Sequence, residues 1–197
     1  MKQMNILFAA GLFAAGVATP AVAVESIYTA VLNGPNEDPS NTSPGTGTAT
    51  VSIDLSSSTM RVQESFSDLT GNTTAAHIHC CTAAPDTGTA GVATTIPTFT
   101  DFPLNVAAGS YDHTFDMTSA SSYNPAFIAA NGGTASGAFN ALVAGLNGGN
   151  AYSNIHTSAF PSGEIRGFLA PVPEPQTYAM LLAGLAAVIA VARRRRV

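Results

Sequence analysis

The sequence predicts an all-β fold: an antiparallel, Greek-key-like β-sandwich or flattened barrel, with one or two short helices before its last strands. Three observations predict it. Several short segments alternate between apolar and polar residues, with the period of two that is typical of half-buried strands. Stretches rich in Gly, Pro, Asn and Ser separate these segments as turns do. Helical spacing between these strands is confined to residues 124–149.

The first three predicted strands lie at residues 26–32, 48–55 and 60–66. Residues 33–47 separate the first two as a loop, because no helix or central strand tolerates so many Asn, Pro and Gly residues. Three serines form the turn between the second and third strands, which are expected to pair as a hairpin. The residues expected on the inward apolar face of this hairpin are Ala49, Val51, Ile53, Leu55, Met60, Val62 and Phe66.

The next predicted strand follows a turn at residues 69–74 and has the sequence AAHIHCC, residues 75–81. Its two histidines and two cysteines make it the segment with the most potentially reactive side chains. The following stretch, residues 82–103, is rich in Thr, Pro and Gly and contains one short predicted strand near residues 92–96. Such a length without regular structure is typical of functional loops. Alternation then returns over residues 110–117.

Two short helices are predicted next. Asn124 as the cap, Pro125 at the first position and Gly132 beyond the end frame the first helix. The second helix has an apolar stripe at i, i+3, i+4 and i+7, formed by Phe139, Leu142, Val143 and Leu146. Closing strands are predicted at residues 151–157 and 164–169. Further residues expected to be buried on inward strand faces are Ile78, Phe115, Ile155 and Ile165.

Residues 1–23 have the pattern of a secretory signal peptide. Lys2 supplies an early cation, an apolar run follows, and Ala21-Val22-Ala23 is a small-residue cleavage site. We expect cleavage after Ala23, with the Sec export machinery and signal peptidase as partners.

The other end of the chain, residues 172–197, combines the motif Pro173-Glu174-Pro175, an apolar run at residues 178–192 and four arginines. The run predicts a separate C-terminal transmembrane helix, but as a helix it rises only about 22 Å, less than the roughly 30 Å of hydrocarbon core. Its shortness favours a processing signal over a permanent anchor. Basic residues prefer the cytoplasmic side, which leaves the rest of the protein outside. The basic cluster is Arg193, Arg194, Arg195 and Arg196.

This tail resembles the PEP-CTERM sorting signal of Gram-negative bacteria. The resemblance implies recognition by an exosortase that cuts near the motif. It further implies export across the inner membrane and transient anchoring there by the C-terminal helix, with a cytoplasmic C-terminus. Delivery to the cell surface or to an extracellular polysaccharide matrix follows, with exopolysaccharide as a candidate partner.

Three motifs in the central region, residues 24–171, occur together in one known family. They are YTAVLNG at residues 28–34, AAHIH at residues 75–79 and NIHTSAFPSGEIRGFL at residues 154–169. In this order they resemble the CHRD family, first described in chordin and widespread in bacterial exported proteins. The resemblance implies a β-sandwich domain and, as for most bacterial members, no assigned biochemical activity. The chain departs from the family where many members have Gly-Pro after the second histidine, because it has Cys80-Cys81 there.

The charge of this central region excludes several classes of protein. It holds eleven acidic residues and two basic ones, Arg61 and Arg166, so its net charge is about −9. Nucleic acid is therefore excluded as a partner, because phosphate binding needs a basic face. Lys2 is the only lysine of the chain, so the exported domain has no P-loop or Schiff-base lysine.

The candidate site consists of histidines. His77 and His79 are two residues apart, so a strand places both on one face, and His156 has a similar setting near the end of the domain. If these strands pair, three imidazoles converge, and three histidines bind zinc or copper readily. We favour a structural polar cluster over the metal site; in this cluster the same histidines bond with Glu164 and Arg166. Acid–base catalysis by the histidines is a third possibility.

Two further features are separate from this site. His113 alternates with Tyr111 and Phe115, which predicts a core histidine rather than a ligand. Cys80 and Cys81 are the only cysteines, and an exported protein leaves them few states: a vicinal disulfide, free thiols, an intermolecular bridge or metal ligation. We favour the vicinal disulfide.

These observations leave three hypotheses for function. The first is an exported, non-enzymatic β-sandwich module of the cell surface or extracellular matrix with a structural or binding role, for which no catalytic residue is assigned. The alternative is a metal-binding or metal-dependent oxidoreductase domain that holds zinc or copper at the three histidines. A second alternative, a binding module for a secreted ligand, rests on the CHRD resemblance alone.

Overall fold

The computed structural model describes residues 25–173 and the single residue Gly184. The signal peptide expected at residues 1–23 and nearly all of the helix expected at residues 178–192 lie outside the described residues. Among the residues that are described, no helix is both long and apolar enough to cross a membrane.

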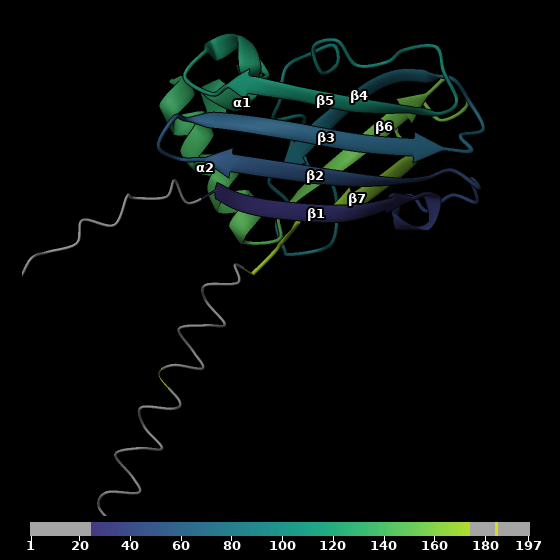
Figure 1. Ribbon diagram of the computed structural model, residues 1–197, viewed down its shortest axis with the longest axis horizontal. Coiled ribbons are helices and arrows are strands. Elements are labelled where there is room, and N and C mark those ends of the chain that lie inside the picture. Colours follow the sequence, from purple (N-terminus) through teal and green to yellow (C-terminus); the bar gives the residue numbers. More distant parts are fainter. Residues whose placement is uncertain (1–24, 174–183, 185–197) are drawn as a thin grey trace, which may run out of the picture.

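The described region consists mainly of antiparallel strands, with two helices between β5 and β6 (Figure 1). The strands are β1 (Glu25–Asn33), β2 (Thr46–Asp54), β3 (Thr59–Ser67), β4 (Thr73–Cys80), β5 (Gly109–Asp116), β6 (Ala151–Thr157), β7 (Ile165–Phe168) and β8 (Ala170–Pro171). The helices are α1 (Pro125–Ala130) and α2 (Ala135–Asn147), with short 3-10 turns at Gly34–Asn36 and Ala120–Ser122. The predicted all-β class with short helices before the last strands is thus confirmed.

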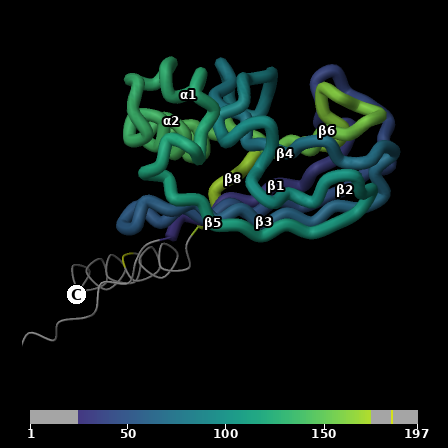
Figure 2. The backbone as a smooth tube through the Cα atoms, turned by 90° about the horizontal axis from the view of Figure 1, so that it is seen from above, coloured from purple at the N-terminus to yellow at the C-terminus, as the bar shows by residue number. Residues whose placement is uncertain are grey.

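The strands form one curled sheet in the order β4-β6-β7-β1-β2-β3-β5, with β8 beside β1. Between β7 and β1 the ladder narrows to a single pair, Asn33 with Arg166. The sheet folds over at this seam, so that β1, β2, β3 and β5 form one layer and β4, β6 and β7 cross it as a second layer (Figures 1 and 2). A half-barrel with two facing layers results, and the expected hairpin of β2 and β3 pairs along its whole length.

The apolar core lies between these two layers. Every apolar side chain that we predicted on an inward strand face from alternation, apart from Leu55, is buried in it. Eight of these residues each expose at most 4 % of their own surface to solvent: Val51, Ile53, Val62, Phe66, Ile78, Phe115, Ile155 and Ile165. Alternation identified these residues because antiparallel strands with one solvated face separate apolar from polar side chains.

The sequence-based interpretation was wrong at two places in the strands. β2 ends at Asp54, so Leu55 lies in the turn and is 57 % exposed. Residues 92–96 form no strand; they make only isolated bridges, between His79 and Val92 and between Thr94 and Tyr123. The stretch from Thr82 to Pro103 instead runs along the free edge of β4, where several of its backbone groups bond to that strand. Its Pro, Gly and Thr content suits such a bonded loop better than a ladder.

α1 begins where its predicted capping residue, Asn124, places it, and α2 begins after a cap that was not predicted, Thr134. The Asn124 side chain accepts a hydrogen bond from the backbone N–H of Ala126, and Thr134 accepts one from Gly137, each at 3.0 Å. The buried face of α2 contains Ala138, Phe139, Leu142, Gly145 and Leu146. The helices pack at one end of the two layers (Figure 2).

Candidate metal centre

His77 and His79 lie on the outward face of β4, because Ala76 and Ile78 occupy its core face. β4 pairs with β6 in a register that sets His77 opposite Asn154 and Ala75 opposite His156. The third histidine therefore projects from the same face of the neighbouring strand. Ring centroids lie 5.3 Å apart for His77 and His156, 5.8 Å for His79 and His156, and 5.9 Å for His77 and His79. The expected convergence of the three imidazoles is present.

Each of the three rings has one nitrogen bonded to a backbone carbonyl of a covering loop. His77 Nε2 lies 2.8 Å from Pro97 O. His79 Nδ1 lies 2.9 Å from Ala90 O, and His156 Nδ1 lies 3.0 Å from Pro161 O. A carbonyl oxygen can only accept, so these three nitrogens carry the hydrogen. The second nitrogen of each neutral ring then has a free lone pair.

These second nitrogens are His77 Nδ1, His79 Nε2 and His156 Nε2. All three are buried and have no hydrogen-bond partner. One ring nitrogen of each histidine lies within 4.8 Å of a ring nitrogen of the other two, and no Cys, Asp or Glu of the described region joins the group. Around one ion at 2.0–2.1 Å, neighbouring nitrogens are about 3.4–3.6 Å apart, so inward shifts of roughly 1 Å would bring the rings onto a metal.

Burial also fixes the protonation state of the rings. Desolvation lowers the pKa of His77 and that of His79 to about 4, with the neighbouring His156 as a further cause for both. Desolvation also lowers the pKa of His156. All three imidazoles are therefore neutral at neutral pH, which is the form that binds metal ions.

Glu164 and Arg166 were expected to form a polar cluster with the histidines, and their hydrogen bonds go elsewhere. The Glu164 carboxylate accepts from the hydroxyls of Ser43 and Thr157 and from the backbone N–H groups of residues 70 and 71. Four donors from three chain segments thus use its lone pairs. Glu164 therefore connects these three segments to one another rather than to the histidines.

Arg166 lies beside the centre without bonding to it. Its guanidinium stands 4.8 Å over the ring of Tyr152, and that ring stacks on His79 at 4.8 Å, only 7° from parallel. Arg166 donates to the backbone carbonyls of residues 36 and 88, and its Nε lies 3.8 Å from Glu37 Oε2. Tyr152 was missed from the sequence, although it alternates with Asn154 and His156 and so shares their face.

The three carbonyls that orient the rings could not have been found from the sequence. Ala90, Pro97 and Pro161 belong to loops, and a backbone acceptor has no side-chain signature. His113 lies on the inward face of β5 between Tyr111 and Phe115, as expected, but its side chain is 29 % exposed and its nearest charged neighbour is Asp101 at 3.9 Å. β5 is the edge of the sheet, so the ring is only half-buried.

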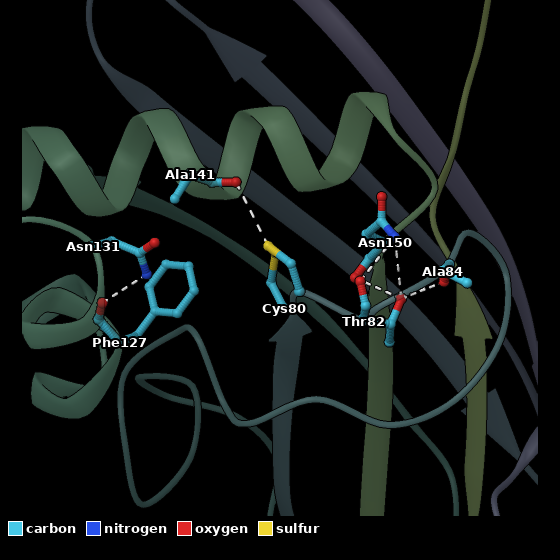
Figure 3. The surroundings of a disulfide bond; sticks show 8 residues. Cys80, Thr82, Ala84, Phe127, Asn131, Ala141 and Asn150 are labelled. Atoms are coloured by element: carbon cyan, nitrogen blue, oxygen red, sulfur yellow. Dashed lines mark hydrogen bonds between the residues drawn. A yellow bond between two sulfur atoms is a disulfide. The ribbon is translucent and has the colours of Figure 1, made fainter.

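Cys80 and Cys81 form a vicinal disulfide directly after His79 (Figure 3). Cys80 points into the core, opposite to the histidines, and the bond packs beneath α2. The Sγ of Cys81 lies 3.7 Å from the carbonyl oxygen of Ala141. A Cβ atom placed on Gly145 would come within 2.6 Å of both sulfurs, so this helix position must lack a side chain.

Fold and site together define an all-β domain that encloses three histidines with free, converging nitrogens. The chain belongs to the CHRD domain family, whose model matches residues 28–169 and so covers all three histidines. The PEP-CTERM protein-sorting motif matches residues 171–196. The protein is therefore exported and sorted to the cell surface, and an exosortase recognises it in the export pathway. No curated protein and no solved structure matches the chain.

Proposed function

We propose that this domain is a surface-sorted metal-binding module that holds one zinc or copper ion. Its ligands are His77 Nδ1, His79 Nε2 and His156 Nε2. The observation that carries the proposal is that all three buried nitrogens lack a partner while the opposite nitrogen of each ring bonds to a carbonyl. Metal-binding histidines typically donate their other N–H to such an acceptor, which fixes the tautomer and the ring orientation.

The energetic argument supports a ligand at this point. A buried polar atom without a partner costs about 1–3 kcal/mol, and here three such atoms face one another. Water does not account for them simply, because three acceptors need three donor hydrogens and one water supplies two. A single cation satisfies all three lone pairs at once.

The sorting route belongs to the same proposal. The signal peptide, residues 1–23, directs the chain to the Sec machinery and is removed by signal peptidase. Residues 178–192 hold the protein in the inner membrane until an exosortase cuts near Pro175. The domain is then released to the cell surface or the polysaccharide matrix, where it has a binding role rather than an enzymatic one.

Metal analysis of the protein purified after export tests the proposal. We expect about one equivalent of zinc or copper per chain, or stoichiometric uptake after chelation and titration with either ion. The double variant His77→Ala/His79→Ala should lose this binding, whereas His113→Ala, a half-buried histidine outside the centre, should keep it. Equally weak binding by the wild-type protein and the double variant would overturn the proposal.

A further inference from the structure

We infer that the centre takes monovalent copper, Cu(I), in preference to a divalent ion. This inference rests on the proposed function, because it concerns which ion the three histidines bind. Three properties of the site carry it: the number of protein ligands, the closure of the site and the charge around it.

The first property is the number of ligands. A structural zinc site has four protein ligands in a tetrahedron. Within the described region the group consists of three histidines, with no Cys, Asp or Glu. Cys80 follows His79 directly, but its side chain lies on the core face of β4 and its sulfur is in a disulfide. Neither cysteine can therefore supply a thiolate as the fourth ligand.

The second property is the closure of the site. Zinc sites with three protein ligands keep an open position for water or substrate. Here the three free nitrogens are closed off from solvent, and the residues His77 and His79 are only 6 % and 8 % exposed. The loops that carry Ala90, Pro97 and Pro161 hold the rings from outside. Cu(II) favours square-planar or tetragonal coordination, which three histidines alone do not complete. Cu(I) has a filled d shell and therefore does not require a tetragonal set of ligands.

The third property is charge. All three ligands are neutral imidazoles, and each orienting group is a neutral carbonyl. Of the charged groups nearby, Arg166 is a cation whose partner is Glu37, and the Glu164 carboxylate is occupied by four donors. Among residues 25–173, no carboxylate bonds to a histidine ring of the centre to offset the charge of the ion. Each unit of buried charge without such compensation costs several kcal/mol, so a monovalent ion is favoured over a divalent one.

Competition titrations of the metal-free protein, purified after export, test this inference. Cu(I) is titrated without oxygen against a chromophoric Cu(I) chelator such as bicinchoninate, and Zn(II) and Cu(II) are titrated against their own competing chelators. We expect one Cu(I) per chain, bound at least about a hundredfold more tightly than Zn(II), because several kcal/mol correspond to at least two tenfold steps in affinity.

The variants decide which residues are responsible. His156→Ala removes the least buried of the three ligands and should weaken Cu(I) binding at least about tenfold, because losing even a group that only orients a ligand costs about that much in metal affinity. His113→Ala, outside the centre, should leave Cu(I) binding unchanged. Circular dichroism establishes that each variant is folded. Zn(II) or Cu(II) binding at these histidines as tightly as Cu(I) would overturn the inference and leave the proposed function intact. Binding of no ion would overturn both.

Discussion

The rings of His77 and His156 lie 5.3 Å apart across the pairing of β4 with β6, at an angle of 69°. Each ring donates one nitrogen's hydrogen to a loop carbonyl and directs the other, unpartnered nitrogen into the shared space. The two strands are far apart in the sequence, and only the folded sheet brings these histidines together. The site therefore depends on the packing of the whole domain.

The core should respond strongly to truncation at Phe66. Its ring is 4 % exposed and stacks on Phe102 at 5.6 Å, so Phe66→Ala should lower the free energy of unfolding by about 3–5 kcal/mol. Gln63→Ala, on the outer face of the same strand, should change it by no more than about 0.5 kcal/mol. Urea unfolding of the two variants measures the difference, and similar effects would argue against the inward and outward faces described here.

The buried carboxyl of Glu64 should make stability depend on pH. Burial raises its pKa to about 7, and its bond from the Ser153 hydroxyl does not offset this. The unfolded chain loses this proton near its usual pKa of 4.5, so the contribution of Glu64 to stability falls as the pH rises from about 4.5 to about 7. The loss amounts to about 3 kcal/mol over that range.

Glu64→Gln should remove this loss. His77 and His79 have the opposite effect: because their pKa values are lowered in the folded protein, their contribution to stability is lost as the pH falls. The quantity to compare is therefore the difference in stability between wild type and variant at each pH. Relative to wild type, the variant should gain stability steadily between pH 4.5 and 7. A difference independent of pH would show that Glu64 titrates normally in the folded protein.

Gly145 should be intolerant of a side chain although it lies inside α2. Alanine is the better helix former by about 1 kcal/mol. Its Cβ, however, would clash with the sulfurs of Cys80 and Cys81, so Gly145→Ala should destabilise the domain by about 1–3 kcal/mol. Gly91→Ala is the matched control, because no atom lies within 4 Å of its added Cβ. Thermal unfolding of both variants checks the prediction, which fails if Gly145→Ala melts as high as wild type.

The PEP-CTERM match predicts that the mature protein lacks its tail. Mass spectrometry of the surface fraction should detect peptides up to about Pro175 and none from Tyr178 onward, because the apolar run is short for a permanent anchor. Replacing Pro173-Glu174-Pro175 by alanines should leave the tail attached. An intact tail on the mature wild-type protein would contradict exosortase processing.

Much of this fold could be predicted from the sequence, because strand alternation and helix caps are local signals. They placed β2, β3 and β5 within one or two residues of their observed bounds, and Asn124 located α1. Glu64 is the exception in β3: it lies on the inward face, and only a partner on β6, Ser153, makes its burial tolerable. Local signals cannot reveal a partner on a distant strand.

The candidate site was predictable only in part. The period of two placed His77 and His79 on one face, and the pairing of β4 with β6 added His156. The bonds from the rings to Ala90, Pro97 and Pro161 depend on how two loops fold back over the sheet, and no side-chain pattern encodes them. Because the sequence does not show those bonds, it could not distinguish a polar cluster from a metal site. It also could not show that the Glu164 carboxylate accepts its hydrogen bonds from groups other than the histidines.

The most direct test of the central claim is a crystal structure of the metal-loaded protein with anomalous diffraction at the absorption edge of the bound metal. We predict one anomalous peak about 2.0–2.1 Å from His77 Nδ1, His79 Nε2 and His156 Nε2, with the three carbonyl bonds retained. The same crystals should show no such peak at His113. A protein that crystallises with excess metal and has no peak among the three histidines, or has its peak at other residues, would contradict the account.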